Sequence, residues 1–133
     1  MISWDVTRKV SPPSDGLSNM QRSWAFTGGG PSAKIPPEDR ARIVRGVRET
    51  CAIAGDRSIG LALEVHENNL HDSAAETVHL IEEVNATNLY VNLDIFNLFQ
   101  RGEDPMEALN LLFPYTRILH FKNWTRHQDG QWV

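Results

Sequence analysis

The chain has 133 residues, enough for one domain that buries a hydrophobic core. A net charge of −4 at pH 7 argues against a nucleic-acid-coating surface, because phosphate binding relies on clustered Lys and Arg. No run approaches the ~20 apolar residues that span a bilayer, and the start, Met1–Asp5, lacks the features of a signal peptide. A single cysteine, Cys51, forms no internal disulfide, and its place on a helical apolar stripe predicts a buried spacer. We therefore expect a cytoplasmic protein without nucleic-acid or membrane partners.

The first part of the chain predicts an irregular arm followed by a strand. Residues 1–22 hold Pro12-Pro13 and scattered polar residues without an apolar period, so we predict an N-terminal arm there. Ser23–Thr27 predicts a short strand, which the glycines at 28–30 end. Glycine allows close approach of the backbone, so this run is either a plain turn between a strand and a helix or part of a pocket rim.

Three helices are predicted, each with its own start signal. The first begins at Pro36-Pro37 and ends near Gly55, and apolar residues recur between them at helical spacing. The second begins at Ser73, where Ser-x-x-Glu forms a capping box. The third begins at Asp104 and is stopped by Pro114. Each helix is followed within a few residues by an apolar strand, so the predicted order is β-α-β-α-β-α-β.

Three of these apolar runs end in a residue that can bind a metal. The runs end at Glu64, Asp94 and His120, which are 30 and 26 residues apart. That interval is the length of one strand-plus-helix unit, so the three side chains are expected to meet at one edge of a parallel sheet. Two carboxylates and an imidazole at that edge predict a site for Mn²⁺, Mg²⁺, Co²⁺ or Zn²⁺.

Each of these residues also has a simpler interpretation. Glu64 can be an ordinary loop carboxylate, Asp94 can cap the segment that follows it, and His120 can be a hydrogen-bonded core histidine. His66 lies two residues after Glu64, on the same side of an extended chain. It can contact substrate, or it can lie at the rim of the site without a role in binding. Lys122 shares the side of His120 and is a candidate electrostatic contact with substrate.

The remaining histidines have no partner at a metal-ligand spacing. We expect them at the surface: His71, His79 and His127.

The fold class expected from this order is α/β, with parallel β/α units. Four strands and three helices make about half of a (β/α)₈ barrel, which typically needs ~250 residues. An open four-stranded parallel sheet leaves two exposed edges. We therefore expect either a homo-oligomer or a part of a larger barrel.

The strand-end motifs resemble those of one family. Leu61–His66, Asn88–Asp94 and Ile118–Lys122 are similar to the L-E-x-H, pNl…D and H-x-K-D strand ends of the xylose isomerase-like TIM-barrel superfamily. This group includes sugar-phosphate isomerases and epimerases, inosose dehydratases and the endonuclease IV type of abasic-site nuclease. Trp24–Gly29 resembles the preceding strand. The resemblance implies a partial barrel domain over 23–124, with a C-terminal tail at 125–133.

The resemblance also implies roles for individual residues. Glu64, Asp94 and His120 would be metal ligands, with Glu64 also a catalytic acid/base group. Separately from the resemblance, we expect His66, Asn97 and Lys122 to bind substrate. The family often has His where this chain has Asn97, and Asp where it has Asn123. Its fourth ligand, a Glu on the last strand and the second acid/base group, has no counterpart in this sequence.

Three functions follow from these observations. The first is a metal-dependent isomerase or epimerase of a small-molecule sugar, polyol or cyclitol, which transfers a proton next to a carbonyl. The second is a non-catalytic truncated barrel that binds metal or carbohydrate or only assembles. The third, an abasic-site endonuclease, needs more histidines and a basic DNA track than the sequence shows.

Overall fold

The computed structural model describes residues 21–122, 125 and 127–130. Its elements are β1 (Gln21–Ala25), η2 (Ser32–Lys34), α1 (Pro37–Gly55), β2 (Ile59–Glu64), α2 (Ala74–Val84), β3 (Leu89–Asp94), α3 (Ile95–Gln100), α4 (Pro105–Leu112), η3 (Phe113–Tyr115) and β4 (Thr116–His120). The elements η2 and η3 are single 3₁₀ turns. The predicted alternation of strands and helices is confirmed in this part of the chain.

The four strands form one sheet in the order in which they occur along the chain. β1, β2, β3 and β4 lie side by side, and each neighbouring pair is parallel. Parallel neighbours need a crossover connection, which α1, α2 and the α3–α4 pair provide. Four parallel strands joined in sequence by helices are half of a (β/α)₈ barrel, so the expected fold class is confirmed.

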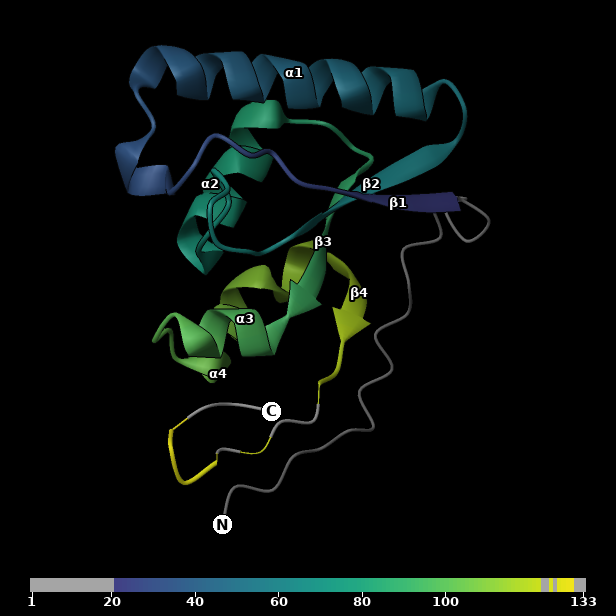
Figure 1. Ribbon diagram of the computed structural model, residues 1–133. Helices are drawn as coiled ribbons and strands as arrows, with labels where there is room; N and C mark the ends of the chain where they lie inside the picture. The colour runs from purple at the N-terminus through teal and green to yellow at the C-terminus, as the bar shows by residue number, and fades with distance from the viewer. Residues whose placement is uncertain (1–20, 123–124, 126, 131–133) are drawn as a thin grey trace.

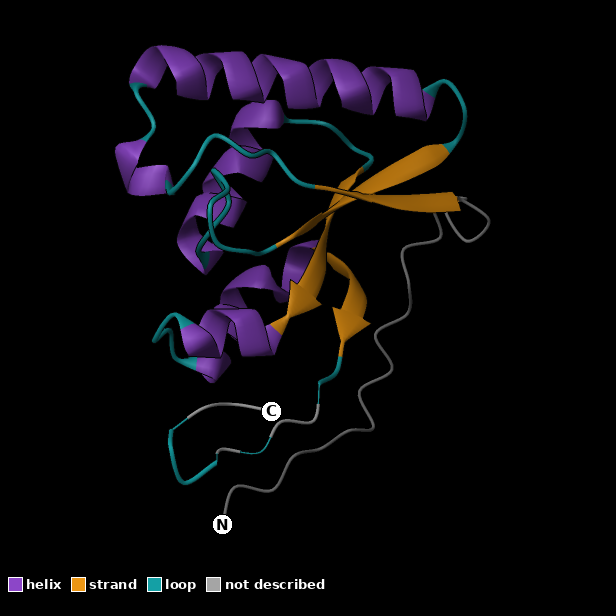
Figure 2. Ribbon diagram, viewed as in Figure 1, coloured by secondary structure: helices purple, strands orange, loops and turns teal. Residues whose placement is uncertain are grey.

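The helices lie on one side of this sheet (Figures 1 and 2). The side chains of β2 and β3 that face them are buried and apolar: Leu61, Leu63, Leu89, Val91 and Leu93. They belong to one core cluster with helix residues that include Cys51, Leu80, Val84, Leu98 and Leu112. Because complete burial of one such side chain contributes roughly 1.5–3 kcal/mol, this layer supplies much of the stability of the fold.

The opposite face of the sheet carries polar residues at the carboxyl ends of the strands. Glu64 lies opposite Asn92, and Asp94 lies opposite His120, with an irregularity in register between Val91 and Asn92. Residues directly opposite each other, and residues two apart on one strand, point to the same face of a sheet. The register therefore places four polar side chains on one face, at one edge.

The helices begin where the sequence predicts. Pro37 occupies the first position of α1, and Ser73 Oγ accepts a 3.1 Å hydrogen bond from the backbone N–H of Glu76 at the start of α2. Asp104 Oδ1 accepts two backbone hydrogen bonds of 2.9 Å at the start of α4. These caps satisfy N–H groups that have no partner within the helix.

The first strand differs from the prediction by two residues. β1 spans Gln21–Ala25, whereas Ser23–Thr27 was expected from its apolar residues. Thr27 leaves the ladder because its hydroxyl accepts a 3.0 Å hydrogen bond from the N–H of Leu70, in the loop after β2. The chain then turns through Gly28–Gly30, all with positive φ. This arrangement corresponds to the turn interpretation of the glycine run.

A short helix between β3 and α4 was not predicted. α3 has only six residues, Ile95–Gln100, and begins where Asp94 Oδ1 accepts hydrogen bonds from the N–H groups of Phe96 and Asn97. Its apolar residues are too few for a helical period to stand out from the adjoining strand. The interpretation of Asp94 as a helix cap is therefore confirmed.

Two arginines of α1 fix that helix to α2. Arg40 forms ion pairs with Glu76 at 2.8 Å and Glu83 at 2.9 Å. Arg48 donates hydrogen bonds to the backbone carbonyl groups of Val84 and Glu83, near the carboxyl end of α2. A cation there satisfies carbonyl groups that the helix leaves without partners.

Two parts of the prediction lie wholly or partly outside the described residues. The N-terminal arm falls on residues 1–20, apart from its last two residues, which belong to β1, and only 125 and 127–130 of the C-terminal tail are described. Among the described residues, none of the helices combines the length and the apolar character that crossing a membrane requires.

Candidate metal centre

Three strand ends bring two carboxylates and an imidazole together. Glu64, Asp94 and His120 are the last residues of β2, β3 and β4, and one potential ligand atom from each lies within 4.8 Å of the others. Glu64 Oε1 and His120 Nδ1 are 3.9 Å apart. The structure therefore brings together the three residues that the sequence predicts to meet, at the carboxyl edge of the parallel sheet.

Asp94 uses its two oxygens for different purposes. Oδ1 accepts the hydrogen bonds that begin α3, at 3.1 and 3.3 Å. Oδ2 is buried, and its one partner among the described residues is the ammonium group of Lys122. The side chain is completely buried, and an ionised carboxylate at such a place needs a compensating cation. The helix cap fixes the orientation of the carboxylate, and Oδ2 stays available to a ligand.

Asn92 is a member of this cluster that the sequence analysis missed. It is completely buried, two residues before Asp94 and directly opposite Glu64. Its amide nitrogen donates a 3.1 Å hydrogen bond to Glu64 Oε2 and lies 3.3 Å from each ring nitrogen of His120. A polar residue two positions before a candidate ligand, within an apolar strand, was the signal that could have found it.

His71 contradicts the prediction that it lies at the surface, because it is completely buried. Its Nε2 lies 2.9 Å from the backbone carbonyl oxygen of Glu64, and Nδ1 lies 3.1 Å from Thr27 Oγ1. A carbonyl oxygen only accepts, so Nε2 carries the proton and the Thr27 hydroxyl donates to Nδ1. Burial lowers the pKa of His71 to about 4, although the bond to Glu64 opposes that shift. Neutral His71 therefore connects the last residue of β2, Glu64, to Thr27 through two hydrogen bonds.

The residues predicted to contact substrate lie around the cluster. Lys122 donates a 3.2 Å hydrogen bond to Asn97 Oδ1 besides its ion pair with Asp94. Asn97 Nδ2 donates to the carbonyl oxygen of Val65 at 3.0 Å, which ties α3 to the chain after β2. His66 is exposed, with its ring edge-on to Phe26 at 5.9 Å between centroids.

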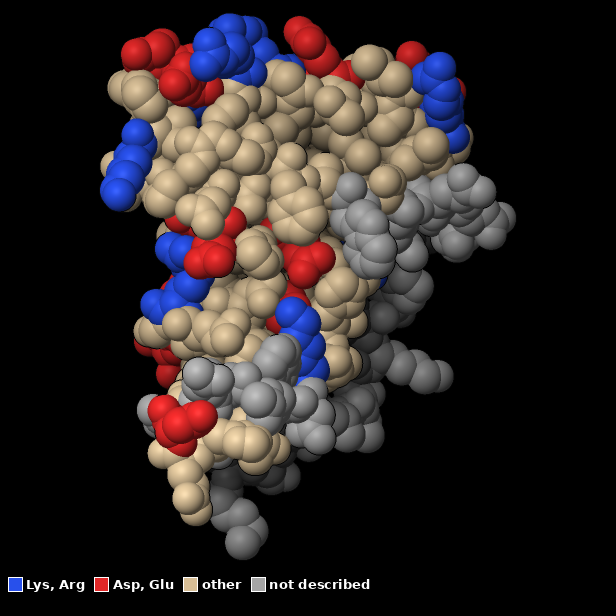
Figure 3. All heavy atoms as spheres, in the orientation of Figure 1, with Lys and Arg blue, Asp and Glu red and all other residues tan. Residues whose placement is uncertain are grey.

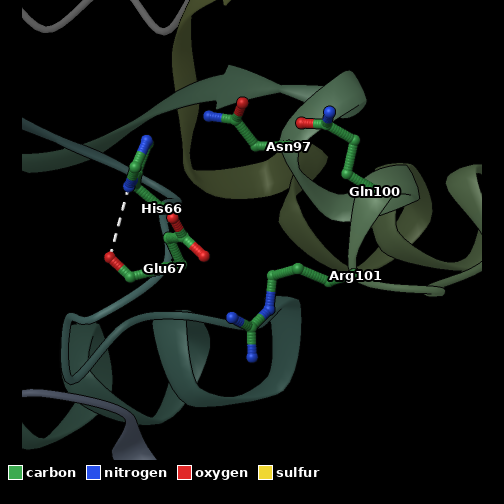
Figure 4. Close-up of a pocket in the computed structure, with 5 residues that line it drawn as sticks. All are labelled: His66, Glu67, Asn97, Gln100 and Arg101. Carbon is green, nitrogen blue, oxygen red and sulfur yellow. Dashed lines mark hydrogen bonds between the residues drawn. The ribbon is translucent and has the colours of Figure 1, made fainter. Parts of the chain in front are cut away.

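A polar pocket of about 270 Å³ opens beside these residues (Figure 4). Its lining residues are His66, Glu67, Asn97, Gln100 and Arg101. They come from the loop after β2 and from α3 with its C-terminal residue, so the pocket lies at the same sheet edge as the metal-ligand candidates. Gln100 and Arg101 were not predicted, because the helix that carries them was not predicted.

The other candidates from the sequence lie away from the cluster. His79 and His127 are exposed, as predicted. Cys51 is buried against the helix-facing side of the sheet, and burial raises the pKa of its thiol. A buried thiol with a raised pKa is a poor nucleophile, so the prediction of a buried spacer is confirmed.

The cluster has the donors that a divalent cation requires. Carboxylate oxygen and imidazole nitrogen suit Mg²⁺, Mn²⁺, Co²⁺ and Zn²⁺ to different degrees. Lys122 supplies one positive charge beside the two carboxylates of Asp94 and Glu64, so a divalent cation would compensate the remaining negative charge. The residues present therefore fit a divalent cation.

Comparison with known proteins identifies relatives of this arrangement. A family model described as "Xylose isomerase-like TIM barrel" matches residues 18–131. A 3-dehydroshikimate dehydratase of Bacillus anthracis is 33% identical over 98 residues, which are 74% of this chain and 35% of that protein. The crystal structure of a probable 3-DHS dehydratase from the same organism superposes with a TM-score of 0.75 at 30% identity, over 79% of this chain and 38% of that one.

Two further solved structures share this part of the barrel. A xylose isomerase-like TIM-barrel protein of Mycobacterium smegmatis, in complex with magnesium, is 26% identical with a TM-score of 0.60, over 73% of this chain and 34% of that chain. A D-psicose 3-epimerase, in the presence of D-fructose, is 30% identical with a TM-score of 0.57, over 62% and 29%. The chain thus spans between 29% and 38% of the length of these relatives. These matches confirm the resemblance inferred from the strand-end motifs.

Proposed function

Because the chain belongs to the xylose isomerase-like TIM-barrel family, we propose that it forms the metal-binding half of a barrel enzyme. The enzyme acts on a small sugar, polyol or cyclitol and transfers a proton next to a carbonyl group. The observation that carries this proposal is the approach of Glu64, Asp94 and His120 to within 4.8 Å at the carboxyl edge of the sheet. Active sites of barrels of this kind are found at that edge.

The first role of the cluster is to hold a divalent cation. Glu64, Asp94 and His120 would supply two oxygens and one nitrogen as ligands. When bound, the cation supplies a Lewis acid that stabilises negative charge on a carbonyl oxygen. The magnesium complex of the Mycobacterium smegmatis relative supports a divalent cation in this family.

Glu64 is the proposed acid/base group. Its Oε2 is held by Asn92, while its side chain keeps 16% of its surface exposed, so substrate can reach the carboxylate. It takes a proton from the carbon next to the carbonyl group and returns it. Return of the proton to the neighbouring atom gives an isomer. Delivery of a proton to the opposite face gives an epimer and needs a second acid group from the rest of the barrel. Loss of a hydroxyl group, which leaves as water with a proton from an acid group, gives a dehydrated product. The names of two relatives, a 3-dehydroshikimate dehydratase and a D-psicose 3-epimerase, support a reaction of this class.

The polar pocket in Figure 4 is the proposed place for the hydroxyl groups of the substrate. It presents amide donors and acceptors from Asn97 and Gln100, together with His66 and the charged Glu67 and Arg101. A mixture of donors and acceptors suits a polyhydroxylated molecule. Lys122 adds a positive charge between this pocket and the cluster.

The distribution of surface charge supports a small-molecule substrate over nucleic acid. On the face in Figure 3, Lys and Arg stand beside Asp and Glu, not in a continuous basic track. The net charge of the chain is −4. Phosphate backbones are bound by aligned basic residues, so these features favour a sugar or cyclitol over an abasic site in DNA.

The rest of the barrel is proposed to come from a second copy or from a longer chain. Among the described residues, β1 and β4 each pair with only one strand, so both sheet edges are open. Beside β4, the exposed apolar side chains of Phe99, Leu119 and Phe121 line a groove of about 300 Å³ that also touches His120. We expect the missing strands of the barrel to cover this groove and to enclose the metal site beside His120.

A second candidate, a non-catalytic domain that binds metal, is favoured by one observation. The cluster described here holds two carboxylates, and one of them, Asp94, caps a helix and pairs with Lys122. That leaves Glu64 as the one carboxylate of the cluster for acid/base chemistry. Metal binding without proton exchange would support this candidate.

Deuterium exchange separates the two candidates. The chain, loaded with Mn²⁺ or Mg²⁺, is incubated in D₂O with D-fructose, D-psicose or a cyclic hydroxy-ketone, and proton NMR follows the signal of the carbon next to the carbonyl group. We expect metal-dependent loss of that signal, and we expect Glu64→Gln to abolish it. The matched control is Glu49→Gln, which changes an exposed carboxylate on α1 outside both the cluster and the polar pocket.

Each result decides between the candidates. Exchange that depends on both metal and Glu64 supports the enzyme. Metal binding without exchange, in a preparation whose oligomeric state has been measured by light scattering, supports the non-catalytic domain. Failure to bind any of the four cations would contradict both.

A further inference from the structure

Asn92 is a completely buried polar residue on the floor of the cluster. It lies on β3, the strand between β2 and β4, two residues before Asp94. Its partner on β2 is Glu64. The neighbouring Val91 and Leu93 point to the helix-covered face and are also completely buried. A polar side chain at such a depth costs stability unless its donors and acceptors are satisfied.

Only one half of the Asn92 amide has partners. Nδ2 lies 3.1 Å from Glu64 Oε2 and 3.3 Å from both ring nitrogens of His120. Oδ1 is buried and accepts no hydrogen bond from any described residue. A buried acceptor without a partner destabilises the fold, so this oxygen is suited to a ligand that the polypeptide does not supply.

The surroundings of Nδ2 match those of a metal ligand. Rotation of the amide by half a turn exchanges Oδ1 and Nδ2 with little change of shape, so Oδ1 can take the same place. Atoms that bind one cation at about 2.1 Å in octahedral geometry lie about 3 Å from their neighbours. The distances of 3.1 and 3.3 Å to Glu64 and His120 are of that size. Without a cation, three acceptors would repel one another there, and the NH₂ group faces them instead.

We propose that Asn92 is a fourth protein ligand of the divalent cation, through its amide oxygen. This inference rests on the proposed function, because it places Asn92 in the same metal centre. It adds a neutral carbonyl oxygen to the two carboxylates and the imidazole of the cluster. Three oxygen ligands out of four favour a hard cation such as Mg²⁺ or Mn²⁺.

The test compares variants that keep or remove the side-chain oxygen. Affinity for Mn²⁺ is measured by calorimetry on the full chain carrying Asn92→Ala, Asn92→Leu or Asn92→Asp, each first checked by circular dichroism and thermal unfolding. Asn92→Leu keeps the number and branching of the side-chain heavy atoms, in case the alanine variant does not fold. The matched controls are Asn88→Ala and Asn88→Asp, since Asn88 is a buried amide near the other end of the same strand.

We expect the two variants without oxygen to bind Mn²⁺ at least tenfold more weakly, and Asn92→Asp to bind at least as tightly as the unaltered chain. The Asn88 variants should keep unaltered affinity, which separates a ligand from an added charge or a lost buried amide. Equal losses in Asn92→Ala and Asn92→Asp would overturn the inference, because they would mean that the NH₂ group matters and the oxygen does not. Unaltered affinity in the folded Ala or Leu variant would overturn it too.

The failure of this inference differs from failure of the proposed function. An unaltered chain that binds Mn²⁺ through Glu64, with Asn92 variants that bind as well, would leave the proposed function intact. An unaltered chain that binds no cation would remove both.

Discussion

The two faces of the parallel sheet bury different kinds of atoms, and they serve different purposes. On the helix-covered face, Leu63, Val91 and Leu93 are completely or almost completely buried among other apolar side chains. On the opposite face, Asn92 and Asp94 are buried as deeply. Among the described residues, Asn92 Oδ1 accepts no hydrogen bond and Asp94 Oδ2 has an ion pair with Lys122. Burial stabilises the first face and costs free energy on the second. The comparison indicates that the fold is stabilised on one side of the sheet, and that the polar groups on the other side are available to the proposed metal ligand.

The largest expected effect tests the apolar face. Leu93→Ala removes a completely buried side chain and should lower the free energy of unfolding by about 3 kcal/mol. The control is Leu119→Ala on β4, where the side chain is 42% exposed and the loss should be much smaller. Urea denaturation measures both. Equal losses of unfolding free energy in the two variants would contradict the account, because they would mean that burial on the helix-covered face does not stabilise the fold.

The pH dependence of stability tests the buried histidine next to the polar face. The pKa of His71 is about 4 in the folded chain and 6.5 in the unfolded chain, so the unfolded state binds the proton first as pH falls. The contribution of the neutral ring is complete above pH 6.5 and is lost as pH falls from 6.5 through 4. The loss by pH 4 is about 3 kcal/mol, since each pKa unit corresponds to 1.36 kcal/mol.

The measurement is urea unfolding of the metal-free chain between pH 7.5 and 4. His71→Gln should remove this part of the pH dependence, whereas the exposed His79→Gln should keep it. An identical pH profile for the unaltered chain and His71→Gln would show that His71 is not the group responsible.

The next prediction separates metal affinity from stability on the polar face. Glu64→Gln and His120→Ala should each lower affinity for Mn²⁺ at least tenfold, because each removes one ligand from the cluster. Both should stay folded, since neither side chain belongs to the apolar core. Calorimetry measures the affinity and thermal unfolding checks the fold. Unchanged metal binding in both variants would remove these residues from the site.

The smallest expected effect concerns the cation already present at the cluster. Lys122 pairs with Asp94 Oδ2, the oxygen assigned to the metal. Lys122→Met removes that competition and should raise affinity for Mn²⁺ by about twofold to fivefold, since a partly exposed ion pair contributes roughly 0.2–1 kcal/mol. The control is Arg117→Met, an exposed cation on β4, the strand that precedes Lys122. Weaker binding by Lys122→Met would mean that Lys122 supports the metal site and does not compete with the metal.

The sequence predicted the parts of the fold that depend on local signals. Ser73 and Asp104 predict the starts of helices because their side chains accept hydrogen bonds from backbone N–H groups that have no partner within the helix. The spacing of Glu64, Asp94 and His120 predicted the cluster because strand-plus-helix units have a narrow range of lengths. Because parallel strands have their carboxyl ends at the same edge of the sheet, no other sequence signal was needed to predict that the three residues meet.

The parts that the sequence did not predict depend on tertiary contacts. His71 has no partner at a recognisable spacing, because its partners, Thr27 and the Glu64 carbonyl group, lie on separate segments. Asn92 was overlooked within an apolar strand, although its parity with Asp94 places it on the polar face. The short α3 has too few residues for a helical period, so its Gln100 and the following Arg101 were missed as pocket residues.

The central claim, that one divalent cation binds between β2, β3 and β4, is tested most directly by anomalous diffraction from crystals of the chain grown with Mn²⁺. The account predicts one strong anomalous peak about 2.0–2.6 Å from a carboxylate oxygen of Glu64, an oxygen of Asp94 and a ring nitrogen of His120. A peak at any other place, or none at these three side chains at saturating Mn²⁺, would contradict it.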